Sequence, residues 1–274
     1  LEPFDIGYLG HNSAETIHLM AEAMKRAYAD RSEFLGDTDF VEVPMQGLMS
    51  KAYAAELRNQ INRFKATSSS TIKPGNAPKY ESEQTTHFSV VDKEGNAVAN
   101  TYTINYGFGS GIVVDGAGFL LNNEMDDFSA KPGVPNVYGL IGGDANAIEP
   151  NKRMLSSMSP TIVLKDGKVF LVTGSPGGAR IITTTLQVIM NVIDHGMNIQ
   201  EAVNAPRVHH QWLPEEIRIE KGVSLDTVKL LTEMGHDVNV KAAMGAASSI
   251  MVDPKTGMFY GASDPRREGL ALGY

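Results

Sequence analysis

The chain has 274 residues, of which 42% are apolar, enough for the core of one large α/β domain or of two smaller ones. Its formal net charge of −8 and the absence of any run of Lys and Arg exclude a nucleic-acid partner, because phosphate binding needs a concentrated basic surface. No apolar run approaches the roughly 18 residues of a membrane span, and the first residues lack the basic and apolar regions of a signal peptide. Because there is no cysteine, disulfides and thiolate metal sites are excluded, and we expect a globular protein that acts on small molecules.

Two helices are predicted near the N-terminus. Residues 12–31 carry apolar side chains at helical spacing, with Asn12 or Ser13 as the cap. A second helix follows Ser50 and ends near Phe64. Because their apolar content is too thin for an independent domain, we expect both helices to pack on another part of the chain.

Residues 65–84 contain almost nothing apolar and predict an exposed, mobile connector. A strand-like run then begins abruptly at Thr85. The connector is either a linker between domains or a place where the chain is cut. If the chain is cut before Thr85, the new N-terminus carries a hydroxyl and an α-amine on one residue, which is a nucleophile with its own general base.

Two strand-like stretches, residues 86–91 and 97–105, flank a short turn that contains a glycine, and so predict a β-hairpin. Counting the register from this turn places Thr85 opposite Thr103. Strand periodicity puts Thr103 and Asn105 on the same face. The sequence therefore predicts a hydroxyl and an amide beside Thr85, although a threonine is also an ordinary strand residue.

A cluster of carboxylates follows at Glu124, Asp126 and Asp127. Such a group is costly to place near a core unless it holds a cation, either a metal such as calcium or the ammonium group of a ligand. A solvated acidic turn is the alternative. The Pro- and Gly-rich loop 131–143, which contains Tyr138, is of the kind that often covers a site.

A second hairpin is predicted where residues 161–164 and 169–173 flank an Asp-Gly turn. Residues 106–111 form a glycine-rich turn without the lysine of a phosphate loop, and they lead to a predicted strand at 112–114.

Two further stretches are rich in hydrogen-bond donors. Ser156 and Ser157 follow a lysine and an arginine, and these donors either hold a carboxylate or cap a turn. Gly177 and Gly178 precede a helix predicted at 181–195, where backbone N–H groups can hold an oxyanion. Tight packing between strand and helix is the alternative for the glycines.

The C-terminal third is predicted to be scaffold. Ser224 caps a helix that runs through Met234, and a last hairpin turns at 253–257. His209 and His210 are adjacent and face opposite ways in a strand. With no third ligand at metal spacing, no metal site is predicted.

Several motifs together resemble the γ-glutamyltranspeptidase family. They are Gln84–His87, Leu121–Asn123, Met125–Ser129, Leu155–Pro160, Thr173–Gly178, Asn204–Arg207 and Tyr260–Arg266. The resemblance covers nearly the whole chain and implies an α+β fold, the αββα sandwich of an N-terminal-nucleophile hydrolase, incomplete in this chain. Residues 1–84 would be the C-terminal portion of the large subunit, and residues 85–274 would be the small, catalytic subunit.

The resemblance also implies roles in catalysis. The proenzyme, or zymogen, would cut itself between Gln84 and Thr85. Thr85 would then be the nucleophile, oriented by Thr103. The backbone amides of Gly177 and Gly178 would stabilise the oxyanion of the tetrahedral intermediate. No cofactor is implied.

For substrate binding, the resemblance implies three residues that hold the α-ammonium of a γ-glutamyl group: Asn105, Glu124 and Asp127. Ser156 and Ser157 would hold its carboxylate. Residues 132–143 would form a lid, with Tyr138 as its gate.

The implied activity is γ-glutamyl transfer or hydrolysis, with glutathione and other γ-glutamyl compounds as donors and amino acids or dipeptides as acceptors. The rest of the large subunit would be the protein partner, and it would supply further strands and an arginine for the substrate carboxylate. The implied location is periplasmic or secreted. The alternatives are a related acylase, acting on glutaryl or β-lactam side chains or on poly-γ-glutamate, and an unprocessed, inactive fragment.

Overall fold

The computed structural model describes residues 1–73, 86–129 and 143–273, which belong to two compact units. The first unit comprises Leu1–Ser82, Glu124–Ser156 and Val208–Lys241, and the second comprises Glu83–Asn123, Ser157–Arg207 and Ala242–Tyr274. The first unit therefore combines residues from before and after the predicted cleavage point. Among the described residues, no helix is both long enough and apolar enough to cross a membrane.

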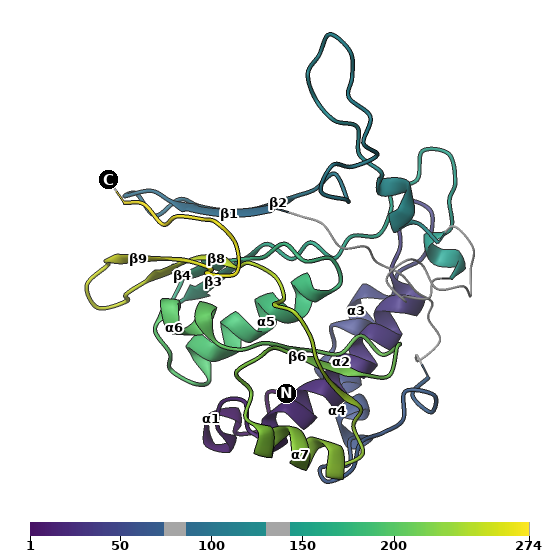
Figure 1. The fold of residues 1–274 in the computed structure, drawn as a ribbon, viewed down its shortest axis with the longest axis vertical. Coiled ribbons are helices and arrows are strands. Elements are labelled where there is room, and N and C mark those ends of the chain that lie inside the picture. Colours follow the sequence, from purple (N-terminus) through teal and green to yellow (C-terminus); the bar gives the residue numbers. More distant parts are fainter. Residues whose placement is uncertain (74–85, 130–142, 274) are drawn as a thin grey trace. The chain divides into compact units, whose positions relative to one another are not determined.

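The second unit contains a two-stranded hairpin, a four-stranded antiparallel sheet and two helices. The hairpin is formed by β1 (Thr86–Val91) and β2 (Ala97–Tyr102). The sheet has the order β3 (Thr161–Lys165), β4 (Lys168–Thr173), β8 (Ser248–Val252) and β9 (Phe259–Ser263). The hairpin packs over one face of the sheet, and α5 (Arg180–Ile193) and α6 (Ile199–Asn204) lie along the other face (Figure 1).

A hydrophobic core fills the space between the sheet and the two helices. Its buried members come from β4, α5, α6, β9 and the residue before β8, and they are Leu171, Val188, Val192, Ile199, Ala202, Val203, Ala247 and Ala262. Burying aliphatic side chains contributes roughly 1.5–3 kcal/mol each. This core fixes the strand ends near which the predicted glycine pair and hairpin lie.

The predicted hairpins are confirmed. In the β3–β4 turn, Asp166 and Gly167 have φ of 51° and 76°, the left-handed values that a two-residue turn of this kind requires. The strand predicted at 112–114 is wrong, because only a single bridge forms between Val113 and Leu120. Two glycines with positive φ between those residues turn the chain back before a ladder can extend.

The first unit is mainly helical. Its helices are α1 (Ile6–Leu9), α2 (Ala14–Phe34), α3 (Met45–Leu48), α4 (Lys51–Asn59) and α7 (Leu225–Glu233), with short helical turns η1 (Glu124–Asp127) and η2 (Asp144–Asn146). Its small sheet pairs β5 (Val208–His209) antiparallel with β6 (Ile217–Ile219), and β6 parallel with β7 (Val238–Val240). Helix α7 connects the two parallel strands.

Helix α2 packs against α4, α7 and β5, so the prediction that it packs on another part of the chain is confirmed. The hydroxyl of Ser13 caps it by accepting a hydrogen bond from the backbone N–H of Thr16 at 3.1 Å. The helix buries polar residues as well as an apolar face, including Glu22 and Lys25.

Two predictions for the chain after α4 are wrong. Helix α4 ends at Asn59 rather than near Phe64, because the side-chain oxygen of Asn62 accepts the backbone N–H of Phe64 and replaces a helical bond. The described part of the predicted connector, residues 65–73, is not a free tether: Ser69 and Ile72 are only 1% and 6% exposed.

Candidate active site

Two of the predicted site residues, Thr103 and Asn105, follow the end of β2 in the hairpin. Thr86 pairs with Tyr102, so the predicted register is confirmed along the described strands. Thr85, the predicted nucleophile, lies outside the described residues. Thr103 follows the last residue of β2, and its hydroxyl accepts a hydrogen bond from the backbone N–H of Asn105 at 2.8 Å.

Asn105 leaves the strand in the left-handed region, with a φ of 69°, a conformation that Asn tolerates better than most residues. The residue is 1% exposed. Its Nδ2 donates to the carbonyl oxygen of Asn123 at 3.1 Å, but its Oδ1 has no hydrogen-bond partner among the described residues. A buried carbonyl without a donor costs on the order of 1–3 kcal/mol, so this oxygen is suited to accept a hydrogen bond from a ligand.

A cavity of about 290 Å³ opens at this end of the hairpin. Its lining combines aromatic rings, hydroxyls and one guanidinium, and consists of Thr86, Tyr102, Thr103, Ile104, Tyr106, Gly107 and Arg267. The cavity therefore lies next to both Thr103 and the start of β1.

His87 joins β1 to its neighbours through a chain of hydroxyl groups. Its Nδ1 lies 2.7 Å from Oγ1 of Thr101, and its Nε2 lies 3.1 Å from Oγ of Ser89. The Ser89 hydroxyl donates to the carbonyl oxygen of Ser248 at 2.9 Å, so it accepts the proton of the His87 Nε2. Burial lowers the pKa of His87 to about 4, which keeps the ring neutral at neutral pH.

The glycine segment before α5 packs directly on this histidine. A Cβ on Gly174 would lie 2.4 Å from Cε1 of His87, so only glycine fits there. The carbonyl oxygen of Gly174 accepts the backbone N–H of Ser248 at 3.2 Å. Gly177 and Gly178 follow with φ of 136° and 59°, which side chains other than glycine rarely adopt. The predicted oxyanion residues are thus held close to the elements that carry His87.

The two predicted carboxylate-binding serines differ. Ser157 is buried, and its Oγ has no hydrogen-bond partner among the described residues, while its carbonyl oxygen accepts the hydroxyl of Ser159 at 2.9 Å. Ser156 is exposed and belongs to the first unit, whereas Ser157 belongs to the second.

The predicted acidic cluster forms η1 in the first unit. Burial raises the pKa of Glu124. Arg31, from α2, is buried nearby: burial lowers its pKa to about 9, and the charges of Tyr28 and Asp127 oppose that shift. The cation beside Asp127 within this unit is therefore a guanidinium. Sequence reasoning missed Arg31 because nothing distinguishes it from a surface arginine.

Some predicted site residues cannot be located. Gln84, Thr85 and Tyr138 lie outside the described residues, as does most of the predicted lid at 132–143. The structure therefore brings together Thr103 and Asn105, and separately places the glycine pair and Ser157 in the same unit.

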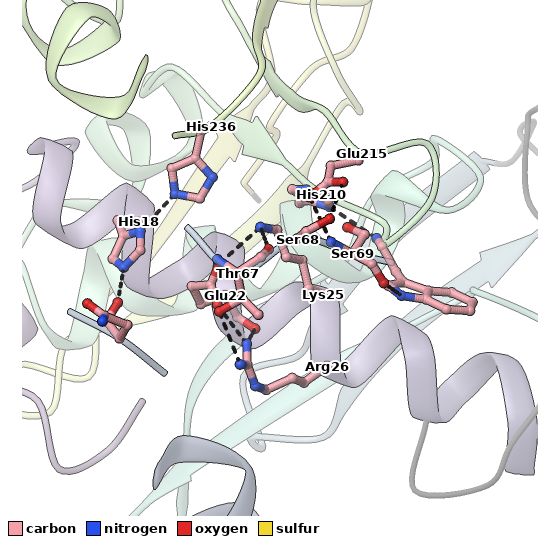
Figure 2. A network of polar contacts seen from close by, with 12 residues as sticks. His18, Glu22, Lys25, Arg26, Thr67, Ser68, Ser69, His210, Glu215 and His236 are labelled. Atoms are coloured by element: carbon pink, nitrogen blue, oxygen red, sulfur yellow. Dashed lines mark hydrogen bonds and ion pairs between the residues drawn. The ribbon is translucent and has the colours of Figure 1, made fainter. Parts of the chain in front are cut away.

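A second buried polar cluster lies on α2 in the first unit (Figure 2). Nδ1 of His18 lies 2.7 Å from Nε2 of His236, and Nε2 of His18 lies 2.7 Å from the carbonyl oxygen of Asn62. Because a carbonyl can only accept, His18 carries its proton on Nε2, and His236 donates to the Nδ1 of His18.

His18, Glu22 and His236 together are residue types that can bind a metal, and their ligand atoms lie within 4.8 Å of one another. The Glu22 carboxylate, however, accepts hydrogen bonds from Nζ of Lys25 at 3.0 Å and NH1 of Arg26 at 2.8 Å. A metal ion here would lie beside two cationic side chains, so we interpret the cluster as a hydrogen-bonded network. Sequence analysis considered only His209 and His210 and missed the four-residue spacing of His18 and Glu22 on one helix face.

The second unit, with a hairpin on one face of a sheet and helices on the other, has the arrangement of an N-terminal-nucleophile hydrolase. Solved structures share this fold. A Helicobacter pylori γ-glutamyltranspeptidase mutant is 66% identical with a TM-score of 0.65, covering 66% of this chain and 100% of that one. A cephalosporin acylase from Bacillus halodurans is 28% identical with a TM-score of 0.81, covering 96% of this chain and 46% of that one.

A sequence profile described as gamma-glutamyltranspeptidase matches residues 1–274, and the chain belongs to this family. It is similar to the glutathione hydrolase proenzyme of Escherichia coli (strain K12), with 64% identity over 275 residues. That match covers 100% of this chain and 47% of the relative, so the chain spans about half the length of the curated relatives it matches.

Proposed function

We propose that, in the whole protein, this chain catalyses γ-glutamyl transfer and hydrolysis on glutathione and other γ-glutamyl amides. The observation that carries this proposal is the buried Oδ1 of Asn105, which has no partner among the described residues and lies beside Thr103 at the start of the site. The α-ammonium of a γ-glutamyl group would donate the missing hydrogen bond. The similarity to a protein named glutathione hydrolase proenzyme supports the same activity.

Maturation would divide the chain between Gln84 and Thr85. Residues 1–84 would then be the C-terminal portion of the large subunit, and residues 85–274 the small subunit. The observed register is consistent with this division, because it pairs Thr86, which would be the second residue of the small subunit, with Tyr102, the neighbour of Thr103 in sequence.

In turnover, the Thr85 hydroxyl would attack the γ-glutamyl carbonyl while its own α-amine takes the proton. The oxyanion that forms would accept hydrogen bonds from the backbone amides of Gly177 and Gly178. Collapse of this intermediate would break the amide bond, return the proton to the leaving amine and leave a γ-glutamyl ester on Thr85. Water would then release glutamate, or an amino acid or dipeptide would take the γ-glutamyl group.

Substrate recognition would use one group of residues for each charge. Asn105, Glu124 and Asp127 would hold the ammonium group, and Ser156 with Ser157 would hold the carboxylate. Support for the second role comes from the buried Ser157 Oγ, which has no partner among the described residues. Tyr138 would gate the site from the lid.

The remainder of the large subunit would complete the site. Relatives about twice as long as this chain support such a partner. A periplasmic or secreted location rests on the family resemblance alone.

The test compares wild type with Thr85→Ala in the full-length protein, using a γ-glutamyl anilide and intact mass. We expect wild type to give two fragments that divide at Thr85 and to release the aniline. Thr85→Ala should stay as one chain and lose at least about a thousandfold in rate, as expected when a nucleophile is removed. Release of product by Thr85→Ala would refute the assignment, and an uncut wild type would favour the inactive fragment.

A related acylase is the second candidate, favoured by the structural likeness to a cephalosporin acylase. A glutaryl group has no ammonium for Asn105, Glu124 and Asp127 to hold. We therefore expect γ-glutamyl anilide to be hydrolysed faster than glutaryl anilide, and the reverse order would favour the acylase.

A further inference from the structure

Residues 66–72, which precede the proposed cleavage point, are bound by residues that follow it in sequence. The carboxylate of Glu215 accepts the backbone N–H of Ser69 at 2.6 Å and the hydroxyl of Ser68 at 2.9 Å (Figure 2). The backbone N–H of Ala66 donates to the carbonyl oxygen of Met234 at 2.7 Å. All these residues belong to the first unit.

Trp212 binds backbone carbonyl groups of the same segment. Its indole Nε1 donates to the carbonyl oxygens of Ser69 at 3.0 Å and Ile72 at 3.2 Å. Trp212 is the chain's single tryptophan, and its backbone has a φ of 68°. For a bulky residue this conformation is strained, and such strain persists only where surrounding contacts over-determine it.

A third contact joins the same parts of the chain. His18 bridges the carbonyl oxygen of Asn62, in the upstream part, and the ring of His236, in the downstream part. Tyr28 of α2 also meets His209 edge to face, with ring centroids 5.7 Å apart. The upstream residues 1–72 therefore contact the stretch 208–236 at several separate points.

We propose that Trp212 and Glu215 form a docking site for the upstream segment 66–72, and that this site holds the upstream fragment after the chain is cut before Thr85. The contacts alone support the docking site. Its role in holding the upstream fragment after cleavage rests on the proposed function. The partner is a short polar segment of the same chain, recognised mainly through its backbone.

Backbone recognition follows from the atoms involved. The indole binds two carbonyl oxygens, and the carboxylate binds one backbone N–H. Among the described residues, only the Ser68 hydroxyl adds a side-chain hydrogen bond from the segment to Trp212 or Glu215, and the Thr67 hydroxyl lies instead 3.5 Å from NH2 of Arg26 on α2. The buried side chain of Ile72 limits the freedom of the segment at its downstream end. The segment's conformation, rather than its serine side chains, therefore determines docking.

The test uses the whole chain with a protease recognition sequence in place of residues 75–81, so it does not depend on self-cleavage at Thr85. After cutting, we expect both fragments to elute together in size-exclusion chromatography and the Trp212 emission to keep its wavelength. Urea should separate the fragments and shift that emission to the red.

Glu215→Gln should weaken the association of the cut fragments about tenfold, because a charge-assisted hydrogen bond is replaced by a neutral one. Ser68→Ala should weaken it less. The matched control is Glu216→Gln, since the Glu216 carboxylate pairs with Arg218 and Lys241 instead of the segment. We expect this control to stay within about twofold of wild type, because the Glu216 pairs are long, at 4.0 and 3.5 Å, and do not involve the segment.

Hydrogen exchange on the uncut wild type provides a second measurement that needs no variant. The backbone amides of Ala66 and Ser69 should be protected. Unprotected amides, separation of the cut wild-type fragments at micromolar concentration, or equal effects of Glu215→Gln and Glu216→Gln would each overturn the docking site. A failure of the Thr85→Ala test with intact docking would instead refute only the proposed cleavage.

Discussion

Two buried polar clusters among the described residues differ in whether their hydrogen-bond acceptors have partners, although Nε of Arg26 in the α2 cluster is a buried donor without one among those residues. On α2, both ring nitrogens of His18 and both carboxylate oxygens of Glu22 are engaged. In the second unit, Oδ1 of Asn105 and Oγ of Ser157 are buried and have no hydrogen-bond partner among the described residues.

The difference indicates a structural role for the α2 cluster and a ligand-binding role for Asn105 and Ser157. A buried polar network with its members paired fixes one conformation, whereas a buried polar atom left unpaired costs stability. Such an atom is expected where a ligand supplies its partner. Removing one member of the α2 network should therefore lower the free energy of unfolding. Removing a member of the second cluster should instead weaken ligand binding.

Glu22→Gln should give the largest effect on stability. Its carboxylate is 0% exposed and pairs with Lys25 and Arg26, so its removal leaves two buried cations without a counter-ion. We expect a loss of about 3–5 kcal/mol in the free energy of unfolding, measured with urea.

The matched control is Glu15→Gln, on the same helix. Glu15 is 38% exposed and pairs with Arg63, so the loss should be at most about 1 kcal/mol. Equal losses from the two variants would mean that the α2 network contributes no more than a surface ion pair.

Ser157→Ala should change substrate binding rather than stability. Removing a buried hydroxyl that lacks a partner should leave the free energy of unfolding unchanged or slightly raised. In the full-length enzyme, the KM for a γ-glutamyl anilide should rise roughly tenfold or more, the loss expected for a hydrogen bond to a charged group. Ser110→Ala, at an exposed turn of the same unit, is the control and should change neither quantity. A destabilised Ser157→Ala with unchanged KM would place Ser157 with the structural cluster.

Gly174→Ala tests whether the site depends on the packing of His87. The new Cβ would lie 2.4 Å from the ring, and such overpacking costs about 1–3 kcal/mol. The melting temperature should fall and kcat should fall with it, since the neighbouring glycine pair is displaced. Gly47→Ala is the control, because a Cβ there meets nothing within 4 Å. Equal melting temperatures for the two variants would show that the His87 ring can move aside without loss of stability.

The elements that sequence predicts correctly are those specified by neighbouring residues. Asp166 and Gly167 adopt the left-handed conformations that make their turn, and Ser13 caps α2 within one turn of helix. The hairpin register needed only the turn position and strand periodicity, and it is confirmed from Thr86 paired with Tyr102 to Val91 paired with Ala97.

Contacts between distant residues could not be predicted. The connector at 65–73 is polar in sequence, yet Trp212 binds the carbonyl oxygen of Ser69 from 143 residues away. The polar residues of α2 interrupt its apolar pattern, and only the fold shows that Glu22 is paired inside. Likewise, the sequence suggested a metal, a ligand's ammonium group or a solvated turn at the acidic cluster, and gave no sign that Arg31 of α2 interacts with Asp127.

The last expected effect concerns pH and the α2 network. Burial, together with the charges of Lys25 and His18, lowers the pKa of His236 to about 3, and the charge of Glu22 opposes this shift. The unfolded chain takes up a proton near pH 6.5, and the folded chain does so only near pH 3. Stability contributed by the neutral ring is therefore complete above pH 6.5 and is lost as pH falls toward 3.

Urea unfolding at several pH values measures this loss. His236→Gln should reduce the slope between pH 6.5 and 4 by up to about 1.4 kcal/mol per pH unit, because one titrating group is removed. His87 adds a slope of the same sign from the second unit and remains in the variant, so some pH dependence should persist. Identical slopes in wild type and variant would mean that His236 binds its proton equally well in the folded and unfolded chains, and the pairing with His18 would then not fix its neutral form.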